Sequence, residues 1–384
     1  MQIDKWPKAG SFFLPMVNFS FLKPPYSFIS RETTTNWCPM PSLLKTVSSA
    51  LLFCVASSSV FGAITAQTQL ADFDDLAYAE ENVAEQVRKN FTSHLFEQKT
   101  EGCPDQENWR IWVSPFVESA KQNGYRNIKG YEQNMGGFTL ATDYQFDEEW
   151  AVSGGFSFAN SHVDILKGRS SGTFQTYAGT IAALWDEYDF FADALFSYLY
   201  NATDAKRRTV GDSAHHDVGS NEVLGHLGGG YAFELISGSS GKFNIYPFVD
   251  LDYGYLMQDD YCERRAHSHN LKVDDKQYDL FRPEGGVGFG YGGCFETVHV
   301  TADLALSYIR ELRFIGRTTH ASFENGSGSL TASGLNPGNN LFSPVARISV
   351  LSKSKQASVM LGYRGEFGSR FIENELELQF KVAF

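Results

Sequence analysis

The chain has 384 residues, which is enough for two ordinary domains or for one large barrel. Its mean hydropathy of −0.26 excludes a helical membrane protein, because each membrane-spanning helix needs about 20 consecutive apolar residues. The formal net charge of −13 argues against a nucleic-acid partner, since phosphate binding requires clustered Lys and Arg side chains.

Near the N-terminus, residues 47–62 form one long apolar run, with Lys45 before it and the small residues Val60 and Gly62 at its end. A basic start, an apolar stretch of about 15 residues and a small-x-small end are typical of a secretory signal peptide. The run is too short and too rich in serine to span a bilayer as a helix. We therefore predict that it is an export signal, cleaved near Gly62.

A signal peptide normally begins within a few residues of the initiator Met, yet this apolar run begins well inside the chain. Met40 directly precedes the segment PSLLK. We predict that translation starts at Met40, that residues 40–62 are the signal peptide, and that residues 1–39 are an extension that the cell does not make. The alternative is a signal peptide with an unusually long N-terminal region.

Between the export signal and Trp109, residues 63–108 contain a stretch without Gly or Pro, Leu70–Gln98. Apolar residues recur there at every fourth position and form a narrow stripe on one face of a helix: Val83, Val87, Phe91 and Leu95. About 25 helical residues would be roughly 37 Å long, enough to pass through a β-barrel from end to end. The helix is therefore either a plug in a barrel lumen or a periplasmic or surface helix that packs elsewhere.

From Trp109 onward, segments that alternate between apolar and polar residues are separated by polar turns, which is the pattern of strands. They predict a barrel domain over residues 109–384 with about twelve strands. The segments are 109–120, 129–145, 149–161, 173–185, 188–202, 219–235, 243–258, 279–291, 295–312, 341–352, 355–367 and 371–384.

The last segment has an apolar residue at every second position: Leu376, Leu378, Phe380, Val382 and Phe384. Other segments place carboxylates between their apolar residues: Asp193, Asp250, Asp252 and Asp303. A carboxylate facing lipid would destabilise the barrel, so the apolar face must meet lipid and the polar face the lumen. A strand in a soluble β-sandwich has the same period, and for the last segment taken alone this alternative stays open.

Short connections alternate with long polar ones. The short ones lie near 146–148, 186–187, 236–242, 292–294 and 353–354. The long ones include 162–172, 203–218, 259–278 and 313–340. Short periplasmic turns, long outer loops and an even strand number are the rule for transmembrane barrels, so we expect both ends of the barrel domain in the periplasm.

Over residues 109–384 the chain resembles the β-domain of autotransporters, the type V secretion proteins. Its first strands read WRIWVSPFVES, NMGGFTLATDYQF and WAVSGGFSFANSHVD, and its middle strands read GHLGGGYAF, IYPFVDLDYGYL and RPEGGVGFGY. The final hairpin reads LGYRGEFGSRFIENELELQFKVAF. The order and spacing of these pieces make the resemblance specific, and the polymorphic outer membrane protein branch is nearest in texture.

The resemblance implies an all-β fold, a 12-stranded antiparallel transmembrane barrel with an N-terminal helix in its lumen. It implies residence in the outer membrane lipid bilayer of a Gram-negative cell, as a monomeric barrel. The partners it implies are the barrel-assembly machinery and periplasmic chaperones. In this family, alternate apolar residues before a terminal aromatic are similar to the signal that the machinery reads, and the five apolar residues of the last segment match it.

The chief departure from the family is the short region between the signal peptide and Trp109, which leaves room for the helix and for little or no passenger. We therefore expect a translocator without its own cargo, a truncated autotransporter, or a barrel whose loops or pore carry the function. The last alternative would make the protein a porin or an adhesin.

The residues predict no catalytic, cofactor or metal site. Asn82 and Asn90 resemble the helix position at which some autotransporters cut themselves, but neither has a paired Asn, and we expect ordinary polar residues. The outer loops carry two pairs of histidines, His215 with His216 and His267 with His269. Imidazole is a common metal ligand, although polar loops also collect His without binding metal. No Ser and His occupy matching positions on adjacent strands, so a lipase or protease is not expected.

The chain has five cysteines: Cys38, Cys54, Cys103, Cys262 and Cys294. The first two would be lost with the N-terminal segments, and the remaining three lack the spacing of a disulfide framework or a zinc site. Cys103 and Cys294 would both lie at the periplasmic rim, where they could pair, whereas Cys262 would lie in an outer loop.

Overall fold

The structure is a computed structural model. It describes residues 76–95, 108–124, 129–147, 149–166, 170–187, 189–209, 212–238, 241–295, 298–315, 318–326, 328–333, 340–352, 354 and 356–384. The start at Met40, the signal peptide at 40–62 and Cys103 lie outside these residues and remain predictions.

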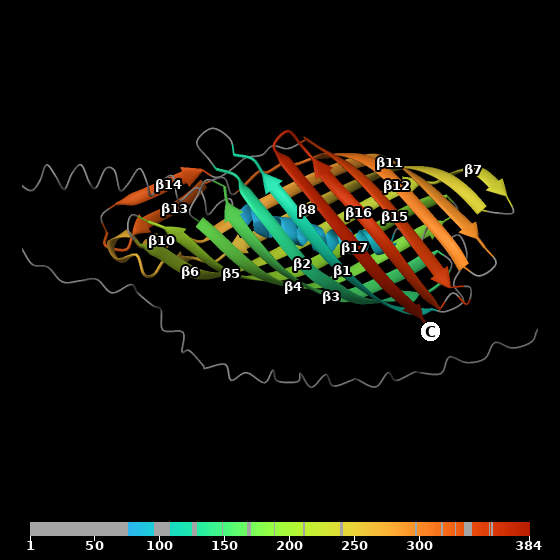
Figure 1. Cartoon of the computed structure of the whole chain (residues 1–384), viewed down its shortest axis with the longest axis horizontal. Coiled ribbons are helices and arrows are strands. Elements are labelled where there is room, and N and C mark those ends of the chain that lie inside the picture. The colour runs from blue at the N-terminus through green and yellow to red at the C-terminus, as the bar shows by residue number, and fades with distance from the viewer. Residues whose placement is uncertain are drawn as a thin grey trace, which may run out of the picture. The chain divides into compact units, whose positions relative to one another are not determined.

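Twelve strands form a closed antiparallel barrel, which confirms the predicted fold class (Figure 1). They are β1 (Trp109–Gln122), β2 (Tyr131–Gln145), β3 (Trp150–Ile165), β4 (Ser170–Glu187), β5 (Phe190–Arg208), β6 (Ser213–Tyr231), β8 (Gly241–Gln258), β11 (Lys276–Cys294), β12 (Val298–Arg310), β15 (Asn340–Ser352), β16 (Ala357–Phe367) and β17 (Phe371–Ala383). The ring closes between the first and last strands, where Val113 lies opposite Phe380. A short strand, β7 (Phe233–Gly238), continues the line of β6 along β8.

The connections distinguish two ends of the barrel. At the turn end the strands are joined by short turns, such as the one between Glu187 and Phe190. At the loop end, two long connections fold into a second sheet, which we call the cap sheet. It consists of β9 (Tyr261–Cys262), β10 (Leu271–Val273), β13 (Thr318–Phe323) and β14 (Ser329–Ser333), and a 3-10 turn, η1 (His267–His269), joins β9 to β10.

Two predicted long connections, 162–172 and 203–218, are largely strand in the structure. For example, Ala205 of β5 pairs with His216 of β6, beyond the apolar part of both strands. The outward side chains of these strand extensions, such as Asp204 and Lys206, are polar and exposed, whereas the inward ones, such as Ala205, are buried. Their sequence therefore lacks the apolar outer face that marks a membrane strand. Backbone pairing with a long neighbour, rather than side-chain period, continues the ladder there.

Burial alternates along the strands as the apolar–polar pattern predicts. In β17 every second residue is buried without a break from Phe371 to Ala383, and the buried set includes Glu373, Glu375 and Glu377. The exposed set is apolar apart from Asn374, so the barrel is polar inside and apolar outside. At the turn end, aromatic side chains from adjacent strands touch, as in the pair Phe190 and Tyr231, whose ring centroids lie 4.6 Å apart. Such girdles are typical of barrels at the membrane interface.

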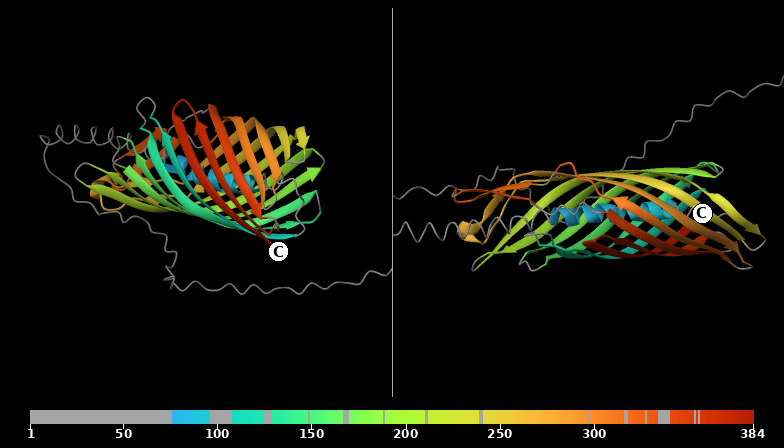
Figure 2. Two further views of the ribbon diagram at one scale, coloured as in Figure 1. Left: turned by 45° about the vertical axis from the view of Figure 1, so that its right-hand side comes forward. Right: turned by 90° about the horizontal axis from the view of Figure 1, so that it is seen from above.

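One helix, residues 76–95, runs inside the barrel, and we call it the lumen helix (Figure 2). Its start lies at the loop end, where the Asn82 amide donates to the Tyr131 hydroxyl at the start of β2. Its last turn lies toward the turn end, where His94 meets Asp143 near the end of β2. Twenty residues at about 1.5 Å each give about 30 Å, the thickness of a bilayer core.

Candidate functional site

The apolar stripe of the lumen helix packs against the half of the barrel wall formed by β1–β6. Phe91 meets the indole of Trp112 edge to face, with ring centroids 5.2 Å apart. The wall opposite the stripe is built mainly from small and aliphatic residues: Ala141, Ala151, Ala178, Ala182, Leu184, Leu195, Leu199 and Leu224. Small side chains let the helix approach the wall closely, so one half of the lumen is a dry interface.

The opposite face of the helix is charged and meets acids from β8, β16 and β17. Arg88 Nε lies 3.3 Å from Asp252 Oδ1. Lys89 Nζ lies 2.9 Å from Glu366 Oε1 and also pairs with Glu373. All five side chains are buried. The helix therefore presents its two cations to a wall that supplies three carboxylates.

Acidic and neutral polar groups of the helix pair with arginines of the wall. Arg282 of β11 places Nη1 2.9 Å from Glu85 Oε2. Arg347 of β15 donates from Nη2 to the Ser93 hydroxyl at 2.8 Å. Along the charged face, helix cations thus meet wall carboxylates, and Glu85 and Ser93 meet wall arginines. These contacts define both the rotation and the height of the helix in the lumen.

The last turn of the helix is held by an aromatic and carboxylate contact. The His94 ring stacks on Trp112, with centroids 4.3 Å apart, and His94 Nε2 lies 2.5 Å from Asp143 Oδ2. Asp143 also accepts hydrogen bonds from the Trp112 indole at 3.0 Å and from the Ser153 hydroxyl at 2.6 Å. The Gln379 amide lies 2.9 Å from the other ring nitrogen of His94. The Asp143 carboxylate therefore orients the end of the helix, through its contact with His94.

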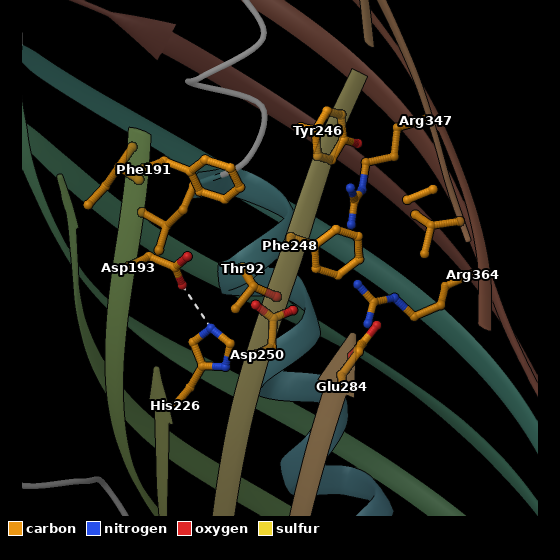
Figure 3. Close-up of a pocket in the computed structure, with 14 residues that line it drawn as sticks. Thr92, Phe191, Asp193, His226, Tyr246, Phe248, Asp250, Glu284, Arg347 and Arg364 are labelled. Atoms are coloured by element: carbon orange, nitrogen blue, oxygen red, sulfur yellow. Dashed lines mark hydrogen bonds and ion pairs between the residues drawn. The ribbon is translucent and has the colours of Figure 1, made fainter. Parts of the chain in front are cut away.

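Beside the last turn, the helix leaves one cavity of about 60 Å³, shown in Figure 3. Acids line one side of it, with Asp193, Asp250 and Glu284 from β5, β8 and β11. Arg347 and Arg364, from β15 and β16, line the other side. This volume holds only a few water molecules. The helix therefore leaves little free space beside its last turn.

The four predicted lumen-facing acids have three kinds of surroundings. Asp193 and Asp252 flank the His226 ring, whose two nitrogens lie 2.8 Å and 2.5 Å from their carboxylates. Figure 3 shows the contact with Asp193. Asp303 is buried and pairs with Arg347, 3.3 Å away. Asp250 is half-buried and lines the cavity. Asp252 forms an ion pair with Arg88 of the helix, whereas the acids that pair with Lys89, Glu366 and Glu373, lie outside this set of four.

Asn82 and Asn90 of the lumen helix, which we expected to be ordinary polar residues, have polar partners on the wall and on the helix. Asn82 donates to the Tyr131 hydroxyl at 3.0 Å and to Gln133 at 3.1 Å. Asn90 accepts from Gln86 and donates to Thr139. Among the described residues there is no cluster of three His, Cys, Asp or Glu side chains suited to a metal ion. No helix in the described part of the chain has the length and apolar character to cross a membrane.

The five apolar residues of the proposed insertion signal all lie on the outer face of the barrel. They are Leu376, Leu378, Phe380, Val382 and Phe384, and each is exposed. The amide of Phe384 donates to the Trp109 carbonyl at 3.0 Å, so even the terminal residue takes part in closing the ring. They form a continuous apolar row beside the seam between the first and last strands.

Sequence reasoning missed the wall residues that pair with the helix, chiefly Glu366, Glu373 and Arg282. The sequence pattern could have identified Glu373 as a lumen residue, because it lies on the polar face of a strand whose apolar face was recognised. Which inward carboxylate meets which helix cation depends on strand stagger, which period does not define.

Comparisons with known proteins agree with this geometry. The autotransporter β-domain family model matches residues 111–364. Outer membrane protein A of Rickettsia rickettsii is 22% identical over 290 residues, which cover 71% of this chain and 12% of that protein. The chain therefore spans only a small part of that relative's length.

Two solved structures share the fold. The translocator domain of the autotransporter NalP from Neisseria meningitidis superposes with a TM-score of 0.60 at 10% identity, covering 81% of this chain and 99% of that one. The transport unit of AIDA-I from Escherichia coli gives a TM-score of 0.55 at 14% identity, covering 77% of this chain and 97% of that one. Since the family model matches well over half of a chain that folds as a helix-filled twelve-stranded barrel, the protein belongs to the autotransporter β-domain family and is a β-barrel of the outer membrane.

Proposed function

We propose that this chain is the translocator of a type V secretion protein. The observation that carries the proposal is the course of the lumen helix, which begins at the loop end and ends near the turn end. In a barrel with short periplasmic turns and outer loops, the chain then enters the helix from the cell exterior. Polypeptide that precedes residue 76 would thus be presented outside the cell.

In the proposed mechanism, periplasmic chaperones deliver the unfolded chain and the barrel-assembly machinery inserts it by its last strand. A hairpin of chain occupies the pore while the preceding segment exits, and the lumen helix then forms in place. The pairs of Arg88 with Asp252 and of Lys89 with Glu366 hold the helix at its final height. Each barrel acts as a monomer, and the barrel itself carries out no catalysis.

An open porin is less well supported. A pore needs a continuous water path, whereas the helix leaves a cavity of about 60 Å³ beside its last turn. An adhesin reading draws support from the ordered cap sheet, which presents Lys272, His320 and Thr331 on its exposed face. The adhesin and translocator readings are separated by asking whether the segment ahead of the helix reaches the cell surface.

The test is to insert an epitope tag ahead of residue 76 and express the full chain in a Gram-negative cell. The translocator reading expects antibody binding on intact cells. As a matched control, the same tag is inserted at residue 188, in the turn between β4 and β5. That tag should bind antibody only after the outer membrane is permeabilised. A tag ahead of the helix that stays inaccessible on intact cells, in a correctly folded barrel, would overturn the proposal.

A further inference from the structure

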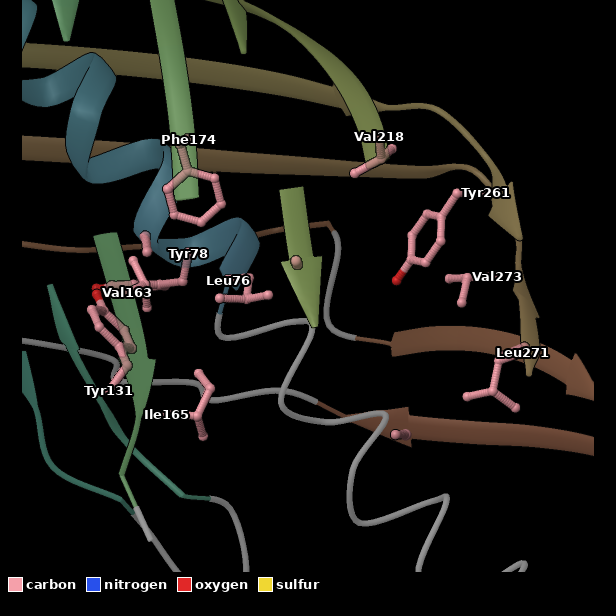
Figure 4. Packing of buried hydrophobic residues seen from close by; sticks show 14 of the residues in the cluster. Leu76, Tyr78, Tyr131, Val163, Ile165, Phe174, Val218, Tyr261, Leu271 and Val273 are labelled. Carbon is pink, nitrogen blue, oxygen red and sulfur yellow. The ribbon is translucent and has the colours of Figure 1, made fainter. Parts of the chain in front are cut away.

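One face of the cap sheet is buried over the loop end of the barrel. Its inward residues are Leu271, Val273, Ala321, Leu330 and Ala332. They pack in one apolar cluster with the barrel rim and with Leu76 and Tyr78 at the start of the lumen helix (Figure 4). Alternate residues of the same strands, such as Thr331, are exposed. The cluster therefore packs the buried face of the cap sheet against the barrel rim and the start of the helix.

Strands β9 and β10 of the cap sheet are tied to the barrel wall. Arg207 of β5 donates from Nε to Glu263 Oε1 at 2.8 Å, and both side chains are buried. Glu263 also accepts the Leu271 amide at 2.9 Å. The ring of Tyr261 stacks on His216 of β6, with centroids 4.1 Å apart. These contacts join one half of the sheet to the wall, without any contribution from the helix.

The segment that leads into β13 is tied both to the barrel wall and to the helix. On the wall side, the backbones of Leu312 and Phe281 of β11 exchange hydrogen bonds of 2.8 Å and 2.9 Å. The Tyr78 hydroxyl donates to Glu311 Oε2 at 2.9 Å. The guanidinium of Arg313 lies 4.1 Å above the centroid of the Tyr78 ring and forms an ion pair with Glu81. Burial has the largest single effect on the pKa of Arg313 and lowers it, but Glu81, Tyr78 and Glu311 together raise the pKa above its ordinary value. Arg313 stays charged, and Glu81 and Tyr78 of the helix supply much of the balance for that charge.

The two halves of the cap sheet therefore differ in what holds them. If the helix were displaced, Arg313 would lose the Glu81 carboxylate and the Tyr78 ring within an apolar mouth. An ionised side chain without its partner there is strongly unfavourable, so the segment would move toward water. Strands β13 and β14 would then leave the cluster by opening the short ladder between β13 and β10, which spans only Leu271–Val273 of β10, while the half tied to Arg207 remains in place.

We propose that the cap sheet is a lid over the outer mouth, locked by Tyr78 and Glu81 of the lumen helix, so that the mouth is sealed only while the helix occupies the lumen. The lid rests on the proposed function in one respect, since it would control the exit of a translocator pore. It couples the end of transit to closure of the membrane, because the same helix that fills the lumen also closes the lid.

The test measures solvent access to β14 in the purified full chain in detergent. All native cysteines are replaced by Ser, and one Cys is introduced by Ala332→Cys, on the buried face, or by Thr331→Cys, on the exposed face of the same strand. With the lid closed, we expect maleimide to label Ala332→Cys at least about tenfold more slowly than Thr331→Cys. Equal rates would overturn the lid.

The locking role of Tyr78 and Glu81 is tested by substituting these helix residues and measuring maleimide labelling of Ala332→Cys in β14. Glu81→Gln removes the carboxylate charge, and Tyr78→Phe removes one hydrogen bond while keeping the ring. Each should raise labelling of Ala332→Cys at least about tenfold. Thr92→Val, at the far end of the same helix, is the matched control and should leave the rate unchanged. If both helix variants label no faster than the parent, the lock is wrong.

Heat-modifiable migration on a gel establishes that each variant still holds a folded barrel, and Tyr78→Phe is mild enough to fold if Glu81→Gln is not. Labelling in detergent does not depend on secretion. A closed and helix-locked lid in a chain that fails to display its tag would therefore overturn only the translocator proposal. Display of the tag with an unprotected Ala332→Cys would overturn only the lid.

Discussion

At the scale of single residues, the lumen is unusual for its buried charges. Lys89 is buried between Glu366 and Glu373 near the middle of the lumen helix. Removing these charges from water is costly, and mutual attraction offsets the cost only while all partners are present. The ion pairs are therefore better understood as determinants of helix position than as sources of net stability.

We predict that Lys89→Met destabilises the folded barrel by about 3 kcal/mol, because it leaves Glu373 buried without its cation and leaves Glu366 with Arg282 alone. The measurement is urea unfolding in lipid vesicles, followed by tryptophan fluorescence. Lys121→Met is the control, since Lys121 pairs with Glu132 where both side chains are about half exposed, and such a pair contributes about 0.5 kcal/mol. If both variants lower the free energy of unfolding equally, the buried pair contributes no more to stability than the exposed one, and the prediction is wrong.

At the scale of elements, the two faces of the last strand have different roles. Its inward face supplies Glu373 and Glu375 to the lumen, and both contact helix residues. Its outward face ends at Phe384, next to the seam with β1. Substitution on one face should therefore affect the helix, and substitution on the other should affect insertion.

We predict that Phe384→Ser lowers the amount of folded barrel in the outer membrane several-fold, because it removes the terminal aromatic of the proposed insertion signal. The measurement is the heat-modifiable band in purified outer membranes. Phe190→Ser is matched in chemistry and exposure, since Phe384 is 60% exposed and Phe190 57% exposed. Phe190 lies at the start of β5, away from the terminal strand. An equal loss for both variants would indicate general destabilisation rather than a lost signal.

The lumen helix is the other element whose two faces differ. The stripe of Val83, Val87, Phe91 and Leu95 is apolar over its whole length, and it packs on the side of the lumen lined by β1–β6. The charged face takes the rest of the lumen circumference. Such a helix is stable only inside a wall that also has one apolar half and one charged half. The apolar and charged faces of the helix therefore match those of the barrel wall.

At the scale of the whole molecule, the helix decides whether the barrel is open. We predict that the full chain in a planar bilayer conducts only rare, small currents, because the cavity of about 60 Å³ beside the helix is not a continuous path. Deleting residues 63–108 should produce large conductance steps, since the twelve strands then enclose an empty lumen. Similar currents from both proteins would place the helix outside the pore and favour a porin.

Much of this architecture follows from local sequence. Twelve segments with period-two alternation predict twelve strands, and carboxylates such as Asp252 and Asp303 define the lumen side. The reason is physical, because lipid rejects charge at each position independently of the neighbouring strands. The helix follows in the same way from its four-residue period.

The tertiary structure alone decided which charges meet and where the outer loops go. The pairing of Lys89 with Glu366 joins residues 277 positions apart in sequence, and it depends on strand stagger and on the rotation of the helix. The cap sheet forms because short segments such as Leu271–Val273 and Ser329–Ser333 find a shared apolar surface that includes the start of the helix. Strands of three to six residues carry too little pattern to be recognised alone. Their stability comes from burial against partners distant in sequence, which no local period encodes.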